Sequence, residues 1–483
     1  MLLRRPMFLR RLATDDRGAV LVLVTLTLPV ILGFAAIVID LGRLAAQQTE
    51  LQSFADHVAL AAAGELDGEP GAIARAQLAA TAVITTDVQT FAQGTRALAA
   101  DADIAFRFLS SLPANDDLPI TAAFVTAADA DARFVEATVG PRNVTFWLTR
   151  AASALVGGAL PNDSDVAATA VAGFTEFVCD VTPLMFCAPN DPALYGSLPG
   201  RMIGLKTGVA WGPGAFGLLD HAAATDGPCG NPNQGASFWR CATALTQGAT
   251  QCVDRRAGVD IRPGNVAGPT ESGLNVRFDI YGTSLNSQRN NPLYAPGPNV
   301  VKGIRPQGGG SCIGNNFNFT TDTVSLPRDS CFATNSCPGG PFGTGIWDEA
   351  GYIATNHNGT PPAGYVPGTG NTRYDLYLAE LAAAGAGDIL PSGKAETGRP
   401  QCSNQMVSNP ERRVLVAAAI DCSTLPPGNA SGVPTLDYWR IFITEPAGIS
   451  GNGDVWVEVI DRVGPMDGGA GEGILRDVVQ LYR

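Results

Sequence analysis

The sequence predicts an α+β protein: a long N-terminal transmembrane and projecting helix, a small α+β unit, then a disulfide-containing, loop-rich, largely β exported region. Three observations predict this: an uncharged apolar run near the N-terminus, ten Cys that all follow residue 178, and 56 Gly with 34 Pro among 483 residues. So many Gly and Pro favour loops and short strands over a largely helical chain. The expected divisions are a cytoplasmic basic segment at 1–18, a transmembrane helix at 19–39, a projecting helix at 40–64, a cysteine-free α+β unit at 65–178 and a cysteine-rich region at 179–483.

The charge composition excludes one class of function. Charged residues make up 16% of the chain and the net charge is −13, so the body of the protein is acidic. An acidic surface repels phosphate backbones, and no basic run follows the first 18 residues. Nucleic-acid binding is therefore not expected.

The apolar run near the N-terminus has the length of a membrane span. No charged side chain occurs within Gly18–Ile39. As a helix, the 21 residues of 19–39 extend about 31 Å, which matches the hydrocarbon core of a bilayer. Pro29 and Gly33 lie inside it, and a membrane helix tolerates both. A processed leader and a buried core helix are the alternatives, although the apolar part of a signal peptide is shorter.

Basic residues before the span predict its orientation. Positive charge stays on the cytoplasmic side of a membrane, so residues after 40 are expected on the far side. No second apolar run reaches 18 residues, which predicts a single-pass protein. The five Arg that set this orientation are Arg4, Arg5, Arg10, Arg11 and Arg17.

The helix is expected to continue beyond the span and to stop at Gly64. Leu44, Leu51 and Val58 recur every seven residues, which gives an apolar stripe at helical spacing. Two interpretations stay open. The stripe packs on the protein's own domain, or it packs laterally with like helices in an assembly. The companion positions of the stripe are Leu41, Gln48, Ala55 and Ala62.

A set of residues along this helix also carries a family resemblance. The set comprises Arg17–Gly18, Pro29, Asp40, Gly42, Arg43, Leu51–Gln52, Ala55–Asp56 and Ala59–Ala63. It resembles the N-terminal segment of TadG-like proteins of the Tad (tight adherence, or Flp) pilus assembly system. The resemblance implies a component anchored in the bacterial inner membrane, with a structural or binding role in pilus biogenesis, adhesion or secretion. Its implied partners are pilus assembly and secretion proteins, pilus subunits and membrane lipid, with no cofactor and no small-molecule substrate.

One feature departs from the pilins of that system. Those proteins are processed after a Gly and carry a Glu at the fifth position after the cut. Counting from Ala19, the fifth residue here is Leu23, and no acidic residue occurs within 19–39. The resemblance therefore favours an anchored assembly component over a major pilin. A processed minor pseudopilin incorporated in the fibre stays an alternative.

The cysteine-free segment at 65–178 reads as a mixture of helix and strand. The sequence predicts a helix over Gly71–Gln89 and alternating strands over Arg133–Val139 and Val166–Phe174. This pattern resembles the small α+β unit that follows the helix in TadG-like chains.

The cysteines predict a disulfide framework, because they are even in number and lie in a loop-rich exported segment. Their pairing cannot be deduced from sequence. The local candidates are Cys179–Cys187 and Cys331–Cys337. A zinc site is not expected, since no CxxC spacing occurs. The ten candidates are Cys179, Cys187, Cys229, Cys241, Cys252, Cys312, Cys331, Cys337, Cys402 and Cys422.

Several later stretches also look TadG-like, and on pattern they are strands. Leu415–Ile420 is an apolar run, which suits a strand buried on both faces. Val455, Val457 and Val459 alternate with other residues, which suits a strand with one less protected face. Residues 319–401 are read as Gly/Asn/Pro-rich connections. The TadG-like stretches are Cys179–Cys187, Trp211–Asp220, Leu274–Tyr281, Arg412–Cys422, Asp437–Pro446, Asp454–Val463 and Val478–Arg483.

No catalytic motif is evident, and no enzyme is predicted. HExxH, GxSxG and Walker A patterns are absent, and three His are few for acid–base work. The closest approach to the DxSxS metal motif of von Willebrand factor A domains, which some TadG-like proteins carry, is Asp421-Cys-Ser423-Thr-Leu425, which lacks the last Ser. No catalytic, cofactor-binding or metal-binding residue is assigned. An exported hydrolase with an unrecognised carboxylate site is the alternative from another class.

Overall fold

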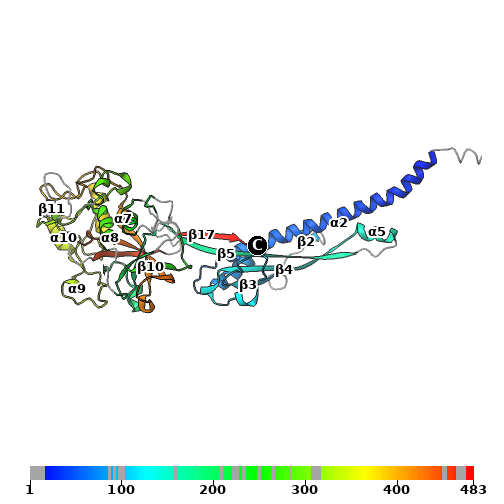
Figure 1. The fold of residues 1–483 in the computed structure, drawn as a ribbon, viewed down its shortest axis with the longest axis horizontal. Helices are drawn as coiled ribbons and strands as arrows, with labels where there is room; N and C mark the ends of the chain where they lie inside the picture. Colours follow the sequence, from blue (N-terminus) through cyan, green and yellow to red (C-terminus); the bar gives the residue numbers. More distant parts are fainter. Residues whose placement is uncertain are drawn as a thin grey trace, which may run out of the picture. The chain divides into compact units, whose positions relative to one another are not determined.

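The computed structural model contains two compact units, each described separately (Figure 1). The N-terminal unit comprises Met1–Thr175 with Asp477–Arg483, and the cysteine-rich unit comprises Glu176–Arg476. The described residues are 17–84, 89–90, 94–95, 104–156, 161–179, 181–206, 210–219, 228–230, 235–246, 252–263, 267–282, 284–305, 317–448, 454–463 and 475–482.

The first element is the helix α2, Arg17–Ala63, which runs unbroken through Pro29. It ends where predicted, with the Gly64 N–H donating to the Leu60 carbonyl at 3.1 Å. The prediction of a long N-terminal apolar helix followed by mixed α+β structure is confirmed. The basic segment expected at 1–18 lies almost wholly outside the described residues.

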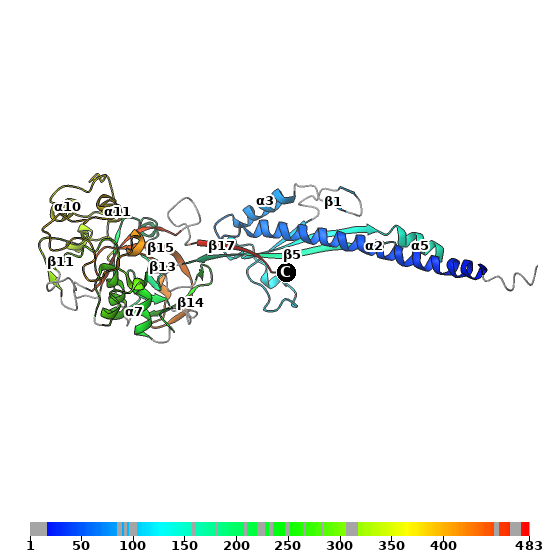
Figure 2. The ribbon, with the colours of Figure 1, turned by 90° about the horizontal axis from the view of Figure 1, so that it is seen from above.

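The N-terminal unit is an antiparallel sheet against which α2 packs (Figure 2). The strands lie in the order β17-β5-β4-β3. Along β5, Val166, Ala168 and Ala170 are buried while Ala167 and Thr169 are exposed, so the predicted alternation holds in this part of the strand. From Val171 to Phe174 every residue is buried, and the alternation expected there is wrong. The elements of this unit are α3 (Ala72–Ile84), β1 (Gln89–Thr90), β2 (Gly94–Thr95), β3 (Ile104–Leu109), β4 (Phe134–Thr145), α5 (Leu148–Val156), β5 (Asp163–Val178) and β17 (Leu475–Leu481).

The cysteine-rich unit is built on a mixed sheet with the order β14-β10-β8-β6-β13-β15-β16-β7. The pair β6–β13 is parallel, and the other pairs are antiparallel. Two short pairs accompany this sheet, β11 with β12 and β9 with the end of β5. The strands are β6 (Leu184–Cys187), β7 (Met202–Leu205), β8 (Phe216–Leu219), β9 (Val253–Asp254), β10 (Val259–Pro263), β11 (Ile304–Arg305), β12 (Asn318–Phe319), β13 (Val414–Ile420), β14 (Ala430–Val433), β15 (Thr435–Ile443) and β16 (Val455–Arg462).

Helices in this unit correct one expectation. Residues 319–401, read from sequence as connections, contain three helices. One of them, α11, begins with a capping box in which Thr372 and Asp375 satisfy each other's backbone N–H groups. The helices of the unit are α6 (Pro192–Gly196), α7 (Ala236–Ala244), α8 (Ala267–Asn275), α9 (Ser330–Ala333), α10 (Glu349–Asn356) and α11 (Arg373–Ala384).

Two of the predicted strands, β13 and β16, lie inside this sheet with a paired strand on each side. Leu415–Ile420 falls within β13 and is buried on both faces, as expected. The expectation of a less protected face on β16 is wrong, because Trp456 is 8% exposed and Glu458 is fully buried. The start of α11 covers that face: Arg373 and Tyr374 donate their backbone N–H groups to the Glu458 carboxylate.

Candidate functional site

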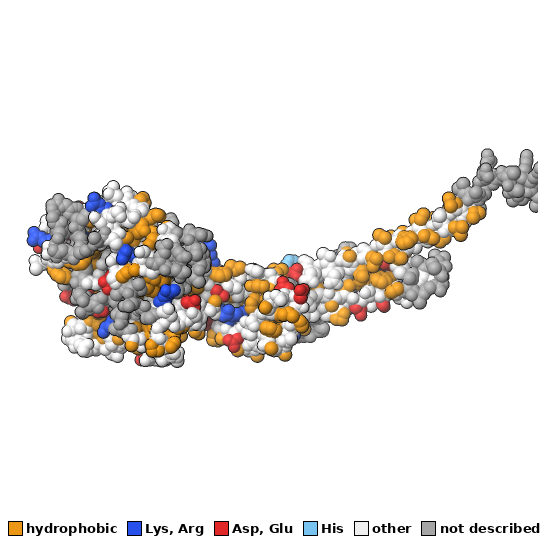
Figure 3. Space-filling view, in the orientation of Figure 1, with side chains coloured by type: hydrophobic (Ala, Val, Ile, Leu, Met, Phe, Trp, Pro, Cys, Tyr) orange, Lys and Arg blue, Asp and Glu red, His pale blue; other side chains and the backbone are white. Residues whose placement is uncertain are grey.

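The first half of α2 presents apolar side chains in every direction. From Val22 to Ile39 its large apolar residues are between 37% and 69% exposed, and Figure 3 shows them along this part of the helix. Among the described residues, this is the one helix long and apolar enough to cross a membrane. Burying such a surface in lipid is favourable, whereas exposing it to water is not.

The second half of α2 forms part of the core of the N-terminal unit. Leu51, Ala55, Val58 and Ala62 are completely buried there, with strands β3, β4 and β5 supplying the facing side chains. The apolar stripe expected from sequence is therefore used inside the protein's own domain. Of the two interpretations of that stripe, the described residues support packing on the same chain.

Polar residues on the same stretch bind the backbone of β5. Gln48 donates to the Ala167 carbonyl at 2.9 Å, and Gln52 donates to the Thr169 carbonyl at 3.1 Å. Gln52 also donates to Asp56 at 2.8 Å. Gln48, the one polar residue among the companion positions of the apolar stripe, thus fixes the helix along the strand.

The two halves of α2 meet at a buried acidic residue. The Asp40 side chain is 2% exposed and accepts the Thr149 backbone N–H at 2.6 Å. Arg43 lies 3.7 Å from the Asp40 carboxylate and donates to the Thr145 carbonyl at 3.3 Å. Its guanidinium also lies over the Trp147 ring, 4.5 Å from the centroid. These contacts tie the end of the apolar segment to the connection between β4 and α5.

These residues define a class of structure in which an N-terminal apolar helix continues into the core of an α+β unit. Residues 18–65 match the family model described as putative Flp pilus-assembly TadE/G-like. The similarity of this segment is to a pilus-assembly family that is not a family of enzymes. The match covers α2 from its second residue to its C-terminal end, and it associates the chain with Tad/Flp pilus assembly. No curated protein and no solved structure matches the chain.

The cysteines of the second unit form long-range crosslinks. Cys179 pairs with Cys252 and Cys187 with Cys422, so the local pair Cys179–Cys187 considered from sequence is wrong. The other local candidate is formed, with 4.8 Å between the Cα atoms of Cys331 and Cys337.

The remaining described cysteines are also bonded. Cys229 pairs with Cys241 across 5.5 Å between Cα atoms, and Cys402 is disulfide-bonded. Cys312 lies outside the described residues.

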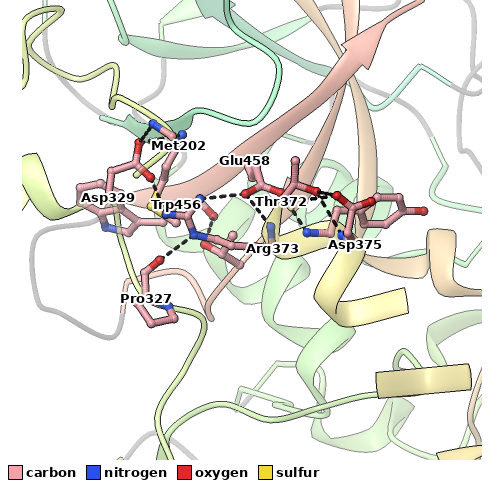
Figure 4. Close-up of polar contacts among 11 residues, drawn as sticks. Met202, Pro327, Asp329, Thr372, Arg373, Asp375, Trp456 and Glu458 are labelled. Atoms are coloured by element: carbon pink, nitrogen blue, oxygen red, sulfur yellow. Dashed lines mark hydrogen bonds and ion pairs between the residues drawn. The ribbon is translucent and has the colours of Figure 1, made fainter. Parts of the chain in front are cut away.

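A buried ionic cluster holds α11 against β16 (Figure 4). The Arg373 side chain is fully buried between Glu458, at 2.8 Å, and Asp329, which it contacts directly. It also donates to the Pro327 carbonyl at 2.6 Å. Burial raises the pKa of Glu458, and the nearby Arg373 partly opposes that rise. Both carboxylates are completely enclosed, so the cluster is structural and does not face a substrate.

Two further buried acids have structural partners. Glu380 accepts hydrogen bonds from Tyr352 and Asn299 and contacts His357 at 2.8 Å. Asp279 accepts the backbone N–H groups of residues 401–403 at 2.5 to 2.8 Å. These acids join distant segments of the unit.

Among the described residues, one less buried pair of carboxylates comes close to the carboxylate site that the hydrolase alternative requires. Burial raises the pKa of Glu271, and the nearby charge of Asp454 raises it further. Burial also raises the pKa of Asp454, against the opposing effect of Lys206 and Arg328. Raised carboxyl pKa values occur at catalytic sites, but structural pairs show them too. No residue of this pair was singled out from sequence.

Asp421-Cys-Ser423-Thr-Leu425, the stretch nearest to the DxSxS metal motif, has a local structural role. Asp421 accepts the Ser423 backbone N–H at 2.9 Å, which caps the short helix Cys422–Thr424. Within the described part of the chain, no group of three or more His, Cys, Asp or Glu side chains is placed to hold a metal ion.

An open groove of about 530 Å³ lies beside the end of α11. Leu378, Ile389 and Met406 form part of its apolar wall, and Arg399 is on its lining. Among the described residues that line it there is no carboxylate or His. The groove therefore suits binding better than acid–base chemistry.

Proposed function

We propose that this protein is a membrane-anchored component of Tad/Flp pilus assembly, with a structural or binding role in pilus biogenesis, adhesion or secretion. The observation that carries the proposal is the match of residues 18–65 to the TadE/G-like family. It falls on a helix whose first half is exposed and apolar and whose second half belongs to a folded unit. Such a helix anchors the unit directly at the membrane surface.

The anchor is single-pass, with its N-terminus in the cytoplasm and its bulk on the periplasmic side of the bacterial inner membrane. Five Arg before the apolar run support this orientation. The disulfides support it independently, because they persist in oxidising compartments and are rare in the cytosol. Pilus assembly and secretion proteins in the membrane, together with pilus subunits, are the proposed partners.

Deletion of the chain tests the assembly role. A strain that lacks it should release less assembled pilus on shearing, while the unassembled pilin subunit accumulates in the cells. Re-expression of the full chain should restore the sheared pilus. Unchanged pilus release in the deletion strain would contradict an assembly role.

Retention of the N-terminus distinguishes an anchor from a processed minor pseudopilin. The mature protein should retain residues before Ala19, because position 23 is Leu and the span holds no acid. Mass spectrometry of the N-terminal peptide from membranes measures this. A mature protein that begins at Ala19 would favour the fibre subunit.

A further inference from the structure

Two large apolar side chains are held outward beside the end of the apolar segment. Trp147 is 64% exposed and Leu148 is 40% exposed. Their positions are fixed, because the next residue, Thr149, donates its N–H to the buried Asp40. The guanidinium of Arg43 lies against the Trp147 ring. Adjacent exposed large apolar side chains form the kind of patch that marks contact with a protein or a membrane.

The position of this pair along α2 indicates which surface that is. Helix α5, which begins at Leu148, packs beside α2 at this level (Figure 2). Ala36 is only 7% exposed, whereas Val38, two residues further along the helix, is 66% exposed. Ala36 precedes Asp40 by four residues, or about 6 Å along the helix axis. The N-terminal unit therefore covers α2 for one further helical turn toward its N-terminus, within the apolar run that ends at Ile39.

We propose that Trp147 and Leu148 lie in the headgroup region of the same membrane that holds α2, so that the N-terminal unit contacts lipid directly. This inference rests on the proposed membrane anchoring. Ala36, the covered residue about 6 Å before Asp40 along the helix axis, lies within the range of about 5–10 Å at which amphipathic segments enter a bilayer interface. Trp is enriched there because its ring is apolar and its N–H is polar. Arg150, which is exposed on α5, adds a guanidinium that pairs well with a lipid phosphate.

This contact gives α2 a second attachment beyond its own span. With one helix alone, the unit can tilt and rotate about the point where the helix leaves the membrane. Apolar contact at α5 fixes the side of the unit that faces the bilayer. The sheet is then presented to neighbouring proteins in one orientation, which suits an assembly component.

Tryptophan quenching by brominated lipids tests the proposal. Trp147 is the one Trp of the N-terminal unit, since the other five of the six lie between residues 211 and 456. The full chain is reconstituted in vesicles whose lipids carry bromine near the headgroup end of the acyl chain. The Trp147→Phe variant should lose most of the lipid-dependent quenching, while the control Trp211→Phe should retain it. Equal quenching of the wild type and Trp147→Phe would overturn the proposal.

A photo-crosslinking amino acid at position 148 gives a measurement independent of Trp147. In native membranes it should form lipid adducts, and a protein adduct instead would assign the surface to a partner or a second copy and overturn the proposal. Vesicle flotation separates this inference from the proposed function. A full chain that does not float with vesicles contradicts the anchor itself. A chain that floats but shows no quenching at Trp147 contradicts only the interfacial contact.

Discussion

The Arg373→Met variant tests whether the buried ionic cluster holds the cysteine-rich unit together. Arg373 is fully enclosed and forms ion pairs with two enclosed carboxylates, Glu458 and Asp329. Met approximates the aliphatic length of the side chain but removes the charge and the hydrogen-bond donors. Both carboxylates then stay buried without their cation.

The expected cost is large for a single substitution. Removing one partner of a buried pair costs about 3–5 kcal/mol, which lowers the folding equilibrium constant by roughly two to four orders of magnitude. The matched control is Arg399→Met, because Arg399 and Asp388 form a pair whose side chains are 44% and 52% exposed. An exposed pair contributes about 0–1 kcal/mol.

Urea unfolding of the full chain in detergent, followed by Trp fluorescence, measures both changes. Five of the six Trp lie in the cysteine-rich unit, so the signal reports mainly on that unit. A loss below about 1 kcal/mol in Arg373→Met, equal to the control, would refute the reasoning. It would mean that the carboxylates find other partners or that water reaches them.

The same variant should change the dependence of stability on pH. Burial already raises the pKa of Glu458 above its usual value of 4.5, and loss of Arg373 raises it further. A carboxyl with a raised folded pKa binds its proton more readily in the folded state, so stability falls as the pH rises above the unfolded value. Lowering the pH from about 7 toward 4.5 should therefore recover part of the stability lost in the variant.

Two further variants test the packing of α2 and the disulfides. Leu51→Ala should destabilise the N-terminal unit by about 2–5 kcal/mol, because Leu51 is fully buried against the sheet; limited proteolysis of that unit measures it, and unchanged protease resistance would contradict the packing. Serine substitution of the pair Cys187–Cys422, separated by 235 residues, should destabilise the other unit more than substitution of Cys331–Cys337, separated by 6. Chain entropy predicts losses of about 5 and 2 kcal/mol, and urea midpoints that fall equally would count against it.

The elements defined by local patterns could be predicted from sequence. An uncharged apolar run, heptad spacing and a terminal Gly define α2, and alternation defines β4 and β5. Several residues of the set that carries the family resemblance also have structural roles. Asp40 binds the start of α5, and Gln52 binds the backbone of β5.

Features that depend on the path of the chain could not be predicted in the same way. Cys187 meets Cys422 because β6 and β13 pair in parallel, with Cys187 opposite Ile420. The spacing of the cysteines along the sequence carries no information about that strand register. Likewise, the alternation on β16 was real, but Glu458 is covered by Arg373, which is 85 residues away.

One omission had a usable signal. Thr372 and Asp375 form a capping box immediately before a run rich in Tyr, Leu and Ala, which is a pattern for a helix start. The surrounding Gly and Pro residues favoured loops, and α11 was missed. The position of Trp147 had no such signal, because its exposure and its contact with Arg43 depend on where α5 packs.

The central claim is that α2 is one helix in two environments: lipid before Asp40 and the protein's own core after it. Extraction with alkaline carbonate tests it most directly, on the full chain and on a chain whose residues 1–35 are replaced by a cleavable export leader. The full chain should stay in the membrane pellet, and the shortened chain should appear in the soluble fraction, folded and disulfide-bonded. A shortened chain that resists extraction, or a full chain that is released, would contradict the account.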